Sequence, residues 1–398
     1  MKTSKYLEYQ DFEWAVKLNR YCLEIAGLWP KSDLTAWNKV ICNLRTLLVF
    51  FSIFFGLLIP TTHSLIKING DIMLMIDNLQ FTLPVIATLL KIAILWWKKE
   101  ALISIIDMIA NDWRTPKTSW EKMRMITRAQ TARTITKCAY CLMTISFFVL
   151  LVLPACNFSV RYVTNITDPG RPLPIQSRYT YDITKSPHYE LTFISQGIST
   201  FLCMIYYIGA DSFFSFLVLH ICGQLDILRN RILHLEIINY AYNLKMCVTD
   251  HTRLLRSIVL VEHTFNIMML ALFLYFAILL SFYGFLILDL SEGGNDLSIF
   301  RAAYLISVII NFVCHSCLYC AIGEILLLQC KRIHYAAYSN KWYNLEPRNS
   351  RNMILLMVRT NESVYLTVGR LFPLTMSTFS NLIKTSASYI SVLLTTKQ

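Results

Sequence analysis

Cysteine is the residue type in this chain whose spacing most resembles a chemical site. Cys314, Cys317 and Cys320 occur at every third position. Cysteine thiolates bind zinc when they converge on one point, usually from a loop. These three lie in an apolar stretch, where a helix would arrange them as a stripe and point His315 away from them. We therefore predict no metal site, and we expect most of the twelve cysteines to act as small hydrophobic residues.

Enzymatic motifs are missing from the sequence. It has no glycine-rich phosphate loop, no nucleophile elbow and no zinc-protease helix, so we predict neither an enzymatic activity nor a cofactor. Ionisable residues inside apolar stretches are more informative, because an unpaired charge in lipid is very costly. We expect Glu324 to be a packing residue and Lys384 to face water, whereas Asp211 could have either a packing or a functional role.

Composition indicates that these residues are positioned by membrane helices. The 398 residues are 55% hydrophobic and 16% charged, with a mean hydropathy of +0.47, which is more apolar surface than a soluble domain can bury. The net charge is +12, but the lysine and arginine residues lie between the apolar stretches and form no compact basic domain. Nucleic acid is therefore not an expected partner. Residues 1–40 lack an early apolar core and cleavage site, and we expect no removable signal peptide.

Seven windows are long and apolar enough to cross a bilayer, which takes about 20 residues. We predict an all-α membrane protein with helices at 41–62, 72–97, 138–156, 191–221, 258–288, 302–330 and 369–394. The second and seventh windows are the weakest, because Asp77 and Lys91 interrupt one and Lys384 interrupts the other.

An amphipathic helix is predicted before the first window, at 11–29, where Pro30 would end it. It would lie on the membrane surface or pack on neighbouring protein. Its apolar face is predicted to contain Leu18, Tyr21, Cys22, Ile25, Leu28 and Trp29.

The orientation follows from the loops, because lysine and arginine are retained on the cytoplasmic side. One alternating set of segments carries 26 of these residues and the opposite set carries seven. This places the amino terminus in the cytoplasm and the carboxyl terminus outside. Asn157 and Asn165 begin glycosylation triplets in the predicted extracellular loop 157–190, whereas Asn361 is predicted to be cytoplasmic and unmodified.

Two predicted cytoplasmic segments, 222–257 and 331–368, are too polar to span a membrane but keep apolar residues at helical spacing, such as Leu225, Leu228 and Ile232. We expect the membrane helices to continue here as an oligomerisation anchor, with ordinary amphipathic surface helices as the alternative. The predicted organisation is 1–40 amino-terminal segment, 41–221 helices one to four, 222–257 anchor, 258–330 helices five and six, 331–368 anchor and 369–398 helix seven.

The orientation argues against a G-protein-coupled receptor, because that class places its amino terminus outside. The chain also lacks an Asp-Arg-Tyr triplet after the third helix and an Asn-Pro-x-x-Tyr motif near its end. A transporter is disfavoured because no inverted repeat with paired broken helices is visible.

Short motifs spread over nearly the whole chain resemble those of insect odorant receptors. They are His220-Ile221-Cys222-Gly223-Gln224-Leu225, Gly323-Glu324, Ala336-Ala337-Tyr338, Trp342-Tyr343 and Lys384-Thr385-Ser386-Ala387-Ser388-Tyr389. The resemblance implies a subunit that assembles with the shared co-receptor into a hetero-tetrameric, odorant-gated, nonselective cation channel in the plasma membrane of olfactory neuron dendrites.

The resemblance also separates this chain from its nearest relatives. The loop between helices four and five is short, as in ligand-tuning subunits, whereas the co-receptor has an extended loop at this place. The chain therefore resembles a ligand-tuning subunit. Gustatory receptors of the same superfamily are the alternative, but their usual ending has Thr before the tyrosine and Gln-Phe shortly after it. Here Ser388 precedes Tyr389, and Ile390-Ser391-Val392 follows.

The resemblance assigns roles to individual residues. The last helix would line the pore, with Val392 at the hydrophobic gate, Thr395 and Thr396 beside it, and Lys384 in an aqueous vestibule. Thr396 departs from the leucine of the co-receptor, so a second apolar ring is not implied. The odorant cavity would lie among the outer halves of helices two, three, four and six. There it would contain Phe81, Phe147, Phe148, Leu151, Phe193, Gln196, Thr200, Phe201, Met204, Tyr304 and Ser307.

Overall fold

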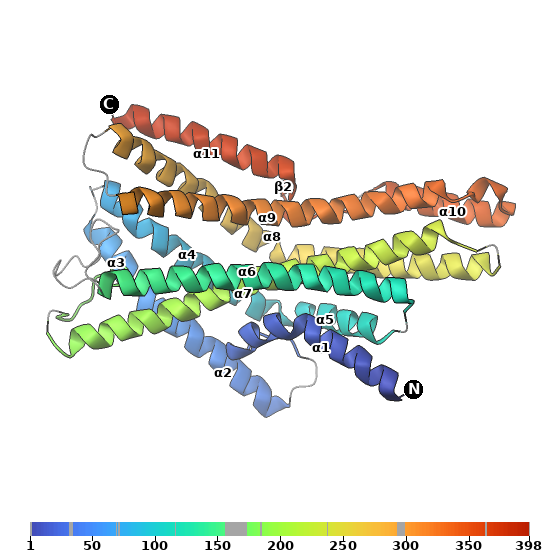
Figure 1. Ribbon diagram of the computed structural model, residues 1–398, viewed down its shortest axis with the longest axis horizontal. Helices are drawn as coiled ribbons and strands as arrows, with labels where there is room; N and C mark the ends of the chain where they lie inside the picture. Colours follow the sequence, from blue (N-terminus) through green and yellow to red (C-terminus); the bar gives the residue numbers. More distant parts are fainter. Residues whose placement is uncertain are drawn as a thin grey trace.

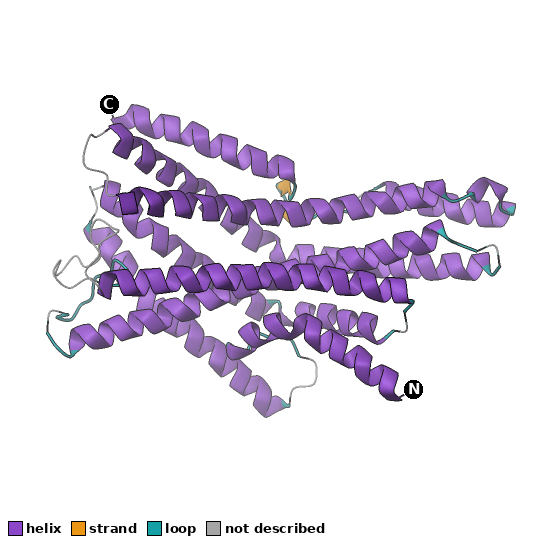
Figure 2. Cartoon of the chain, viewed as in Figure 1, coloured by secondary structure: helices purple, strands orange, loops and turns teal. Residues whose placement is uncertain are grey.

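The protein is an elongated bundle of helices in the computed structural model (Figure 1). The structure describes residues 2–31, 35–68, 70, 72–115, 117–155, 173–183, 185–236, 238–292, 299–362 and 364–397. Helix dominates these residues, and one small antiparallel hairpin is the only sheet among them (Figure 2).

Six helical spans among the described residues are long and apolar enough to cross a membrane. The first is a continuous rod of α2 (Ala36–Ile53), the π-helical η1 (Phe54–Leu58) and α3 (Ile59–Lys67). The other five are α4 (Ile72–Trp97), α6 (Ser119–Ala155), α7 (His188–Leu233), α8 (Tyr240–Glu292) and α9 (Ile299–Ser339). The first six predicted windows fall on these spans.

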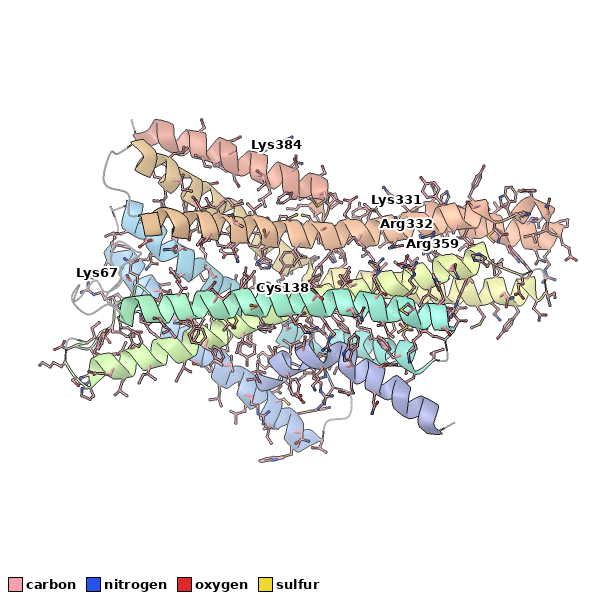
Figure 3. The ribbon with its side chains drawn as sticks, in the orientation of Figure 1. Lys67, Cys138, Lys331, Arg332, Arg359 and Lys384 are labelled. Atoms are coloured by element: carbon pink, nitrogen blue, oxygen red, sulfur yellow. The ribbon has the colours of Figure 1, made fainter. Side chains whose placement is uncertain are left out.

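Four of these helices run well past their apolar windows toward one end of the molecule. There α6, α7, α8 and α9 are joined by η2 (Trp342–Asn344) and α10 (Pro347–Asn361) (Figure 1). The expected continuation of the helices is therefore observed, while their use as an anchor stays a prediction. Lys331, Arg332 and Arg359 lie toward this end, and Lys67 lies at the opposite end (Figure 3).

The seventh predicted helix begins later than expected. It is α11 (Met376–Lys397), and it starts at residue 376 rather than 369. Before it, β1 (Thr367–Val368) and β2 (Phe372–Pro373) pair as a hairpin whose turn holds Gly369 and Arg370 at φ +62°. Two residues with positive φ cannot continue a right-handed helix. The hairpin is docked on α8, where the carboxylate of Glu262 accepts the Thr367 N–H at 2.8 Å.

The amino-terminal helix α1 (Lys2–Ile25) packs on α5, α6 and α7. Its buried side chains include Ala15, Val16 and Leu23, whereas Tyr21 and Ile25 are 60% and 55% exposed. The predicted apolar face was therefore wrong for Tyr21 and Ile25, whereas Leu28 and Trp29 are buried and Leu18 and Cys22 are half-buried as part of it. The predicted end at Pro30 was also late, because Gly27 at φ +71° ends the helix.

A further amphipathic helix, α5 (Lys99–Arg114), lies beside α1 and was not predicted as a separate element. Its buried stripe follows helical spacing and contains Leu102, Ile105, Ile106 and Ile109. That signal was present in the sequence between the second and third windows.

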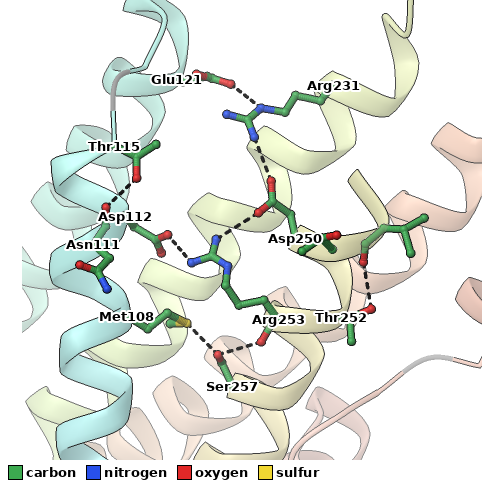
Figure 4. A network of polar contacts seen from close by, with 12 residues as sticks. Met108, Asn111, Asp112, Thr115, Glu121, Arg231, Asp250, Thr252, Arg253 and Ser257 are labelled. Atoms are coloured by element: carbon green, nitrogen blue, oxygen red, sulfur yellow. Dashed lines mark hydrogen bonds and ion pairs between the residues drawn. The ribbon is translucent and has the colours of Figure 1, made fainter. Parts of the chain in front are cut away.

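Charged side chains connect α5 to α8 at the end that carries α10 (Figure 4). Asp112 on α5 contacts His220 at 3.0 Å and Arg253 at 2.5 Å. Arg231 bridges Glu121 at 2.7 Å and Asp250 at 3.0 Å. Burial alone would raise the pKa of Asp112, but hydrogen bonds and charge from His220 and Arg253 hold it below its ordinary value. The network fixes the relative positions of α5, α6, α7 and α8.

Candidate functional site

Three ionisable side chains from three different helices meet in the interior of the bundle. Lys91 Nζ on α4 lies 2.6 Å from Asp211 Oδ1 on α7, and His315 Nε2 on α9 lies 3.0 Å from Asp211 Oδ2. The Lys91 and Asp211 side chains are 1% and 11% exposed. Pairing offsets part of the cost of burying each charge in an apolar interior. The pair explains why Lys91 can interrupt an otherwise apolar helix.

Lys91 is buried on α4, and its ammonium faces α7. Its ammonium also donates to the Tyr207 carbonyl oxygen at 3.3 Å and lies 3.4 Å from the centroid of the Tyr207 ring. This is a cation–π contact in addition to the ion pair. Lys91 is therefore held behind Tyr207.

Aromatic rings hold His315 in place. Its imidazole stacks on Tyr319, with centroids 5.1 Å apart and an angle of 17° between the rings. Tyr207 and Phe276 contact it at centroid distances of 5.6 and 5.4 Å. A ring fixed in this way presents its nitrogen to Asp211 in one orientation.

A cavity of about 560 Å³ lies next to this cluster, between α4, α6, α7, α8 and α9. Asp211 and His315 line it, whereas Lys91 is not among the lining residues. The rest of the lining is mainly aromatic, aliphatic and sulfur-containing. It includes Ile135, Cys138, Leu142, Met143, Cys203, Met204, Tyr207, Tyr275, Phe312, Cys314 and Tyr319. An apolar cavity with a few polar groups on one wall suits a small, mostly apolar molecule.

The cavity opens on one side of the bundle. Leu142 on α6 and Asn311 on α9 line it and are exposed, as are Cys138 and Cys314. Cys138 lies on α6 between the two ends of the molecule (Figure 3). The opening is therefore between α6 and α9, within the apolar length of the bundle, where lipid would surround the protein.

The residues predicted for the odorant cavity are not all gathered around this space, and Met204 is the one that lines it. Gln196 is buried elsewhere. Its Nε2 donates to Ser177 Oγ at 2.6 Å and to the Tyr179 hydroxyl at 2.9 Å, which ties the loop at 173–183 to α7. The rings of Phe147 and Phe201 are in contact, with their centroids 5.3 Å apart.

The remaining predicted residues are dispersed over the helices. Phe148 and Ser307 are exposed, Thr200 is buried, and Phe81, Leu151 and Phe193 are half-buried. The Tyr304 side chain lies outside those that the structure describes.

The predicted pore helix α11 packs against α8 and α9 along one side. The α8 contact is close at Gly284, where an added Cβ would lie 2.1 Å from Ile390 Cδ1. The side away from α8 carries several polar residues, and Lys384 points away from the bundle (Figure 3). Exposed residues on α11 include Asn381, Lys384, Thr385, Ser388 and Val392. The Thr395 and Thr396 side chains, and all of Asn157 and Asn165, lie outside the described part of the chain.

Glu324, for which we expected a packing role, lies at the start of α11. Its Oε2 accepts the Met376 N–H at 3.3 Å, which satisfies one of the free donors at the helix amino terminus. The neighbouring Gly323 allows the backbone at Leu374 to pack directly against α9. A Cβ at residue 323 would lie 2.2 Å from the Leu374 carbonyl oxygen. The Gly323-Glu324 pair therefore joins α9 to the beginning of the predicted pore helix.

Comparisons with known proteins agree with this architecture. The family model of the 7tm odorant receptors matches residues 71–387. Odorant receptor 10 of Aedes albopictus is 27% identical over 219 residues, which cover 52% of this chain and 56% of that protein. Odorant receptor 9a of Drosophila melanogaster is 20% identical over 371 residues, covering 90% of this chain and 91% of that receptor.

A solved structure shares the fold over almost the full length. The olfactory receptor OR5 of Machilis hrabei, solved in complex with eugenol, superposes with a TM-score of 0.82 at 16% identity. The superposition covers 98% of this chain and 99% of that one.

Proposed function

Because the chain belongs to the 7tm odorant receptor family, we propose that it is an odorant-binding subunit of a ligand-gated, nonselective cation channel. It is a multi-pass membrane protein, which we place in the plasma membrane, and its partner in the proposed hetero-tetramer is the odorant co-receptor. The observation that carries the proposal is the cavity beside Asp211, which lies between five helices and has a mainly apolar lining. Its volume of about 560 Å³ suits a small volatile molecule.

The contacts of the cavity walls suggest how binding reaches the pore. Tyr275 on α8 and Phe312 on α9 line the cavity, and both of these helices pack on α11. A ligand that fits better when α8 and α9 are displaced would favour a different position of α11. Binding then opens the channel by its differential affinity for the open state.

The exposed side of α11 supports a pore-lining role. Asn381, Lys384 and Ser388 would be poorly accommodated by lipid but well accommodated by water. Val392, 57% exposed near the end of α11, would form an apolar ring when several subunits surround one axis. Such a ring blocks ions by excluding water until it widens.

A groove between α8 and α10 supports assembly through the predicted anchor. It has a volume of about 1110 Å³ and is lined by apolar side chains such as Val248, Leu255 and Leu355. An exposed apolar groove of this kind is suited to a protein partner, and a neighbouring subunit is the partner that the tetramer requires.

The channel assignment can be tested in cells that express this chain with and without the co-receptor. We expect odorants to evoke a rapid cation current only when both chains are present. In the same cells, Val392→Cys should make the current sensitive to a thiol reagent applied from outside. Ile390→Cys is the matched control, because Ile390 packs toward Gly284 on α8 and should be protected.

Wild-type receptor treated with the same reagent gives the background from native cysteines such as Cys138 and Cys314, which are exposed. If modified Val392→Cys channels conduct as before, α11 does not line the pore at this position. Absence of current from a complex that reaches the cell surface, over a broad odorant panel, would contradict the channel proposal itself.

A further inference from the structure

The Asp211 carboxylate is the one charged hydrogen-bond acceptor among the described residues that line the cavity, whereas neighbouring groups such as Ser212, Asn311 and Tyr319 can donate or accept. An ionised carboxylate has about four acceptor sites. Lys91 occupies one site on Asp211 Oδ1, His315 approaches Oδ2, and the Tyr319 hydroxyl also interacts with this carboxylate. Acceptor capacity therefore remains on a carboxylate that is buried in the protein and lines the cavity. If His315 turns its Nε2–H toward Asp211, its Nδ1 is a second acceptor.

The charge of the cluster limits which polar groups a ligand can bring. Among the described lining residues, Asp211 is the only acid and no lysine or arginine is present. Asp211 is already neutralised by Lys91, so a ligand ammonium would add an uncompensated positive charge in an apolar site. A ligand carboxylate would face the Asp211 carboxylate, while Lys91 stays shielded behind Tyr207. Both charged classes are therefore disfavoured.

We propose that the cavity selects neutral odorants that carry a hydroxyl group, namely alcohols or phenols, and that this hydroxyl donates a hydrogen bond to Asp211. The inference rests on the proposed function and names the ligand class for the same cavity. The apolar body of the ligand would lie against Met143, Met204 and Phe312. An ether or hydrocarbon of the same size would fill this space but would leave the acceptors of Asp211 without a donor.

Matched ligand sets test the proposal in cells that express this chain with the co-receptor. Hexanol, cyclohexanol and benzyl alcohol are each compared with the methyl ether, the amine and the carboxylic acid of the same skeleton, alongside a broad panel of esters and ketones. We expect the best alcohol to act at a concentration about tenfold lower than its ether, because a hydrogen bond to a charged acceptor is the stronger kind. Partitioning into lipid would favour the ether, so it cannot produce this result.

A double variant removes the charges together. Lys91→Met with Asp211→Val leaves neither an unpaired ion nor an acceptor side chain at residue 211, and it should reduce the alcohol-to-ether preference to about equal potency. Cys141→Ala, on the same helix but outside the cavity lining, is the control and should keep the wild-type ratio. Loss of the preference in the double variant alone would support the assignment.

The possible failures can be distinguished. If ethers, amines, acids, esters or ketones match or exceed the alcohols, the ligand class is wrong while the channel proposal stands. A preference for alcohols that survives in the double variant would also overturn the role of Asp211. If no compound in the sets or the wider panel evokes current from a surface-expressed complex, the proposed function fails, and this inference fails with it.

Discussion

At the scale of single residues, the interior of this receptor depends on a charge pair that no local pattern reveals. Lys91 and Asp211 were visible in the sequence only as interruptions of apolar windows, and the role of Asp211 was left open. Their contact at 2.6 Å joins positions that are 120 residues apart. A hydropathy window shows that a charged residue lies in an apolar stretch. It does not show which opposite charge pairs with that residue in the folded protein. His315, set aside as a metal ligand, is the third member of the same cluster.

Lys91→Met should destabilise the protein more than the double variant Lys91→Met with Asp211→Asn. The single change leaves a buried carboxylate without its cation, which typically costs about 3–5 kcal/mol. The double change leaves a neutral amide that can be hydrogen-bonded or tolerated. Thermal unfolding of the detergent-solubilised receptor would show a lower Tm for the single variant. Equal Tm losses in both variants would mean that the charges do not stabilise each other.

At the scale of elements, the positions of the membrane helices were largely legible from the sequence because their signal is local. A window of apolar residues predicts a membrane helix wherever it occurs, and α4 coincides with its window at 72–97. The start of α11 was not legible in the same way. Residues 367–373 form a hairpin because Glu262 and the Asn266 carbonyl oxygen on α8 accept its backbone N–H groups. Contacts between residues so far apart in the sequence produce no pattern in the sequence of the hairpin itself.

The junction between α9 and α11 should tolerate no side chain at residue 323. Gly323→Ala would bring Cβ to 2.2 Å from the Leu374 carbonyl oxygen, so the backbone before α11 must shift. We expect reduced odorant-evoked current and a lower Tm, with a cost of about 1–3 kcal/mol for the overpacking. Gly197→Ala is the matched control, because there Cβ would meet Leu151 Cδ2 at an ordinary 3.5 Å. If both variants behave alike, the close approach at Gly323 does not constrain α11.

At the scale of the whole molecule, the architecture was predictable in outline, and the position of the cavity was not. Seven apolar windows and their polar extensions define a bundle with one long polar end, and the structure has that shape (Figure 1). The resemblance to odorant receptors favoured the outer halves of four helices for ligand binding. The cavity beside Asp211 is lined by residues of α4, α6, α7, α8 and α9, and how these helices pack together is not written in any local stretch of the sequence, while the predicted ligand residues stay a prediction.

The polarity of the molecule in the membrane gives a last prediction. α1 begins toward the end that carries α10, and α11 finishes at the opposite end (Figure 1). Lys331, Arg332 and Arg359 lie toward the α10 end (Figure 3). Because lysine and arginine are retained in the cytoplasm, the α10 end should be inside and the end of α11 outside. An antibody to a tag after residue 398 should bind intact cells, whereas a tag before residue 1 should require permeabilisation.

Glycosylation provides an independent check of the same orientation. Removal of both Asn157 and Asn165 by substitution with glutamine should abolish any shift in mobility on glycosidase treatment, because their loop is predicted to be extracellular. Asn361→Gln is the control and should change nothing, since this residue ends α10 at the predicted cytoplasmic end. An amino-terminal tag that is accessible on intact cells would reverse the assignment. In that case the Val392 end of α11 would face the cytoplasm, and a thiol reagent would have to reach it from inside.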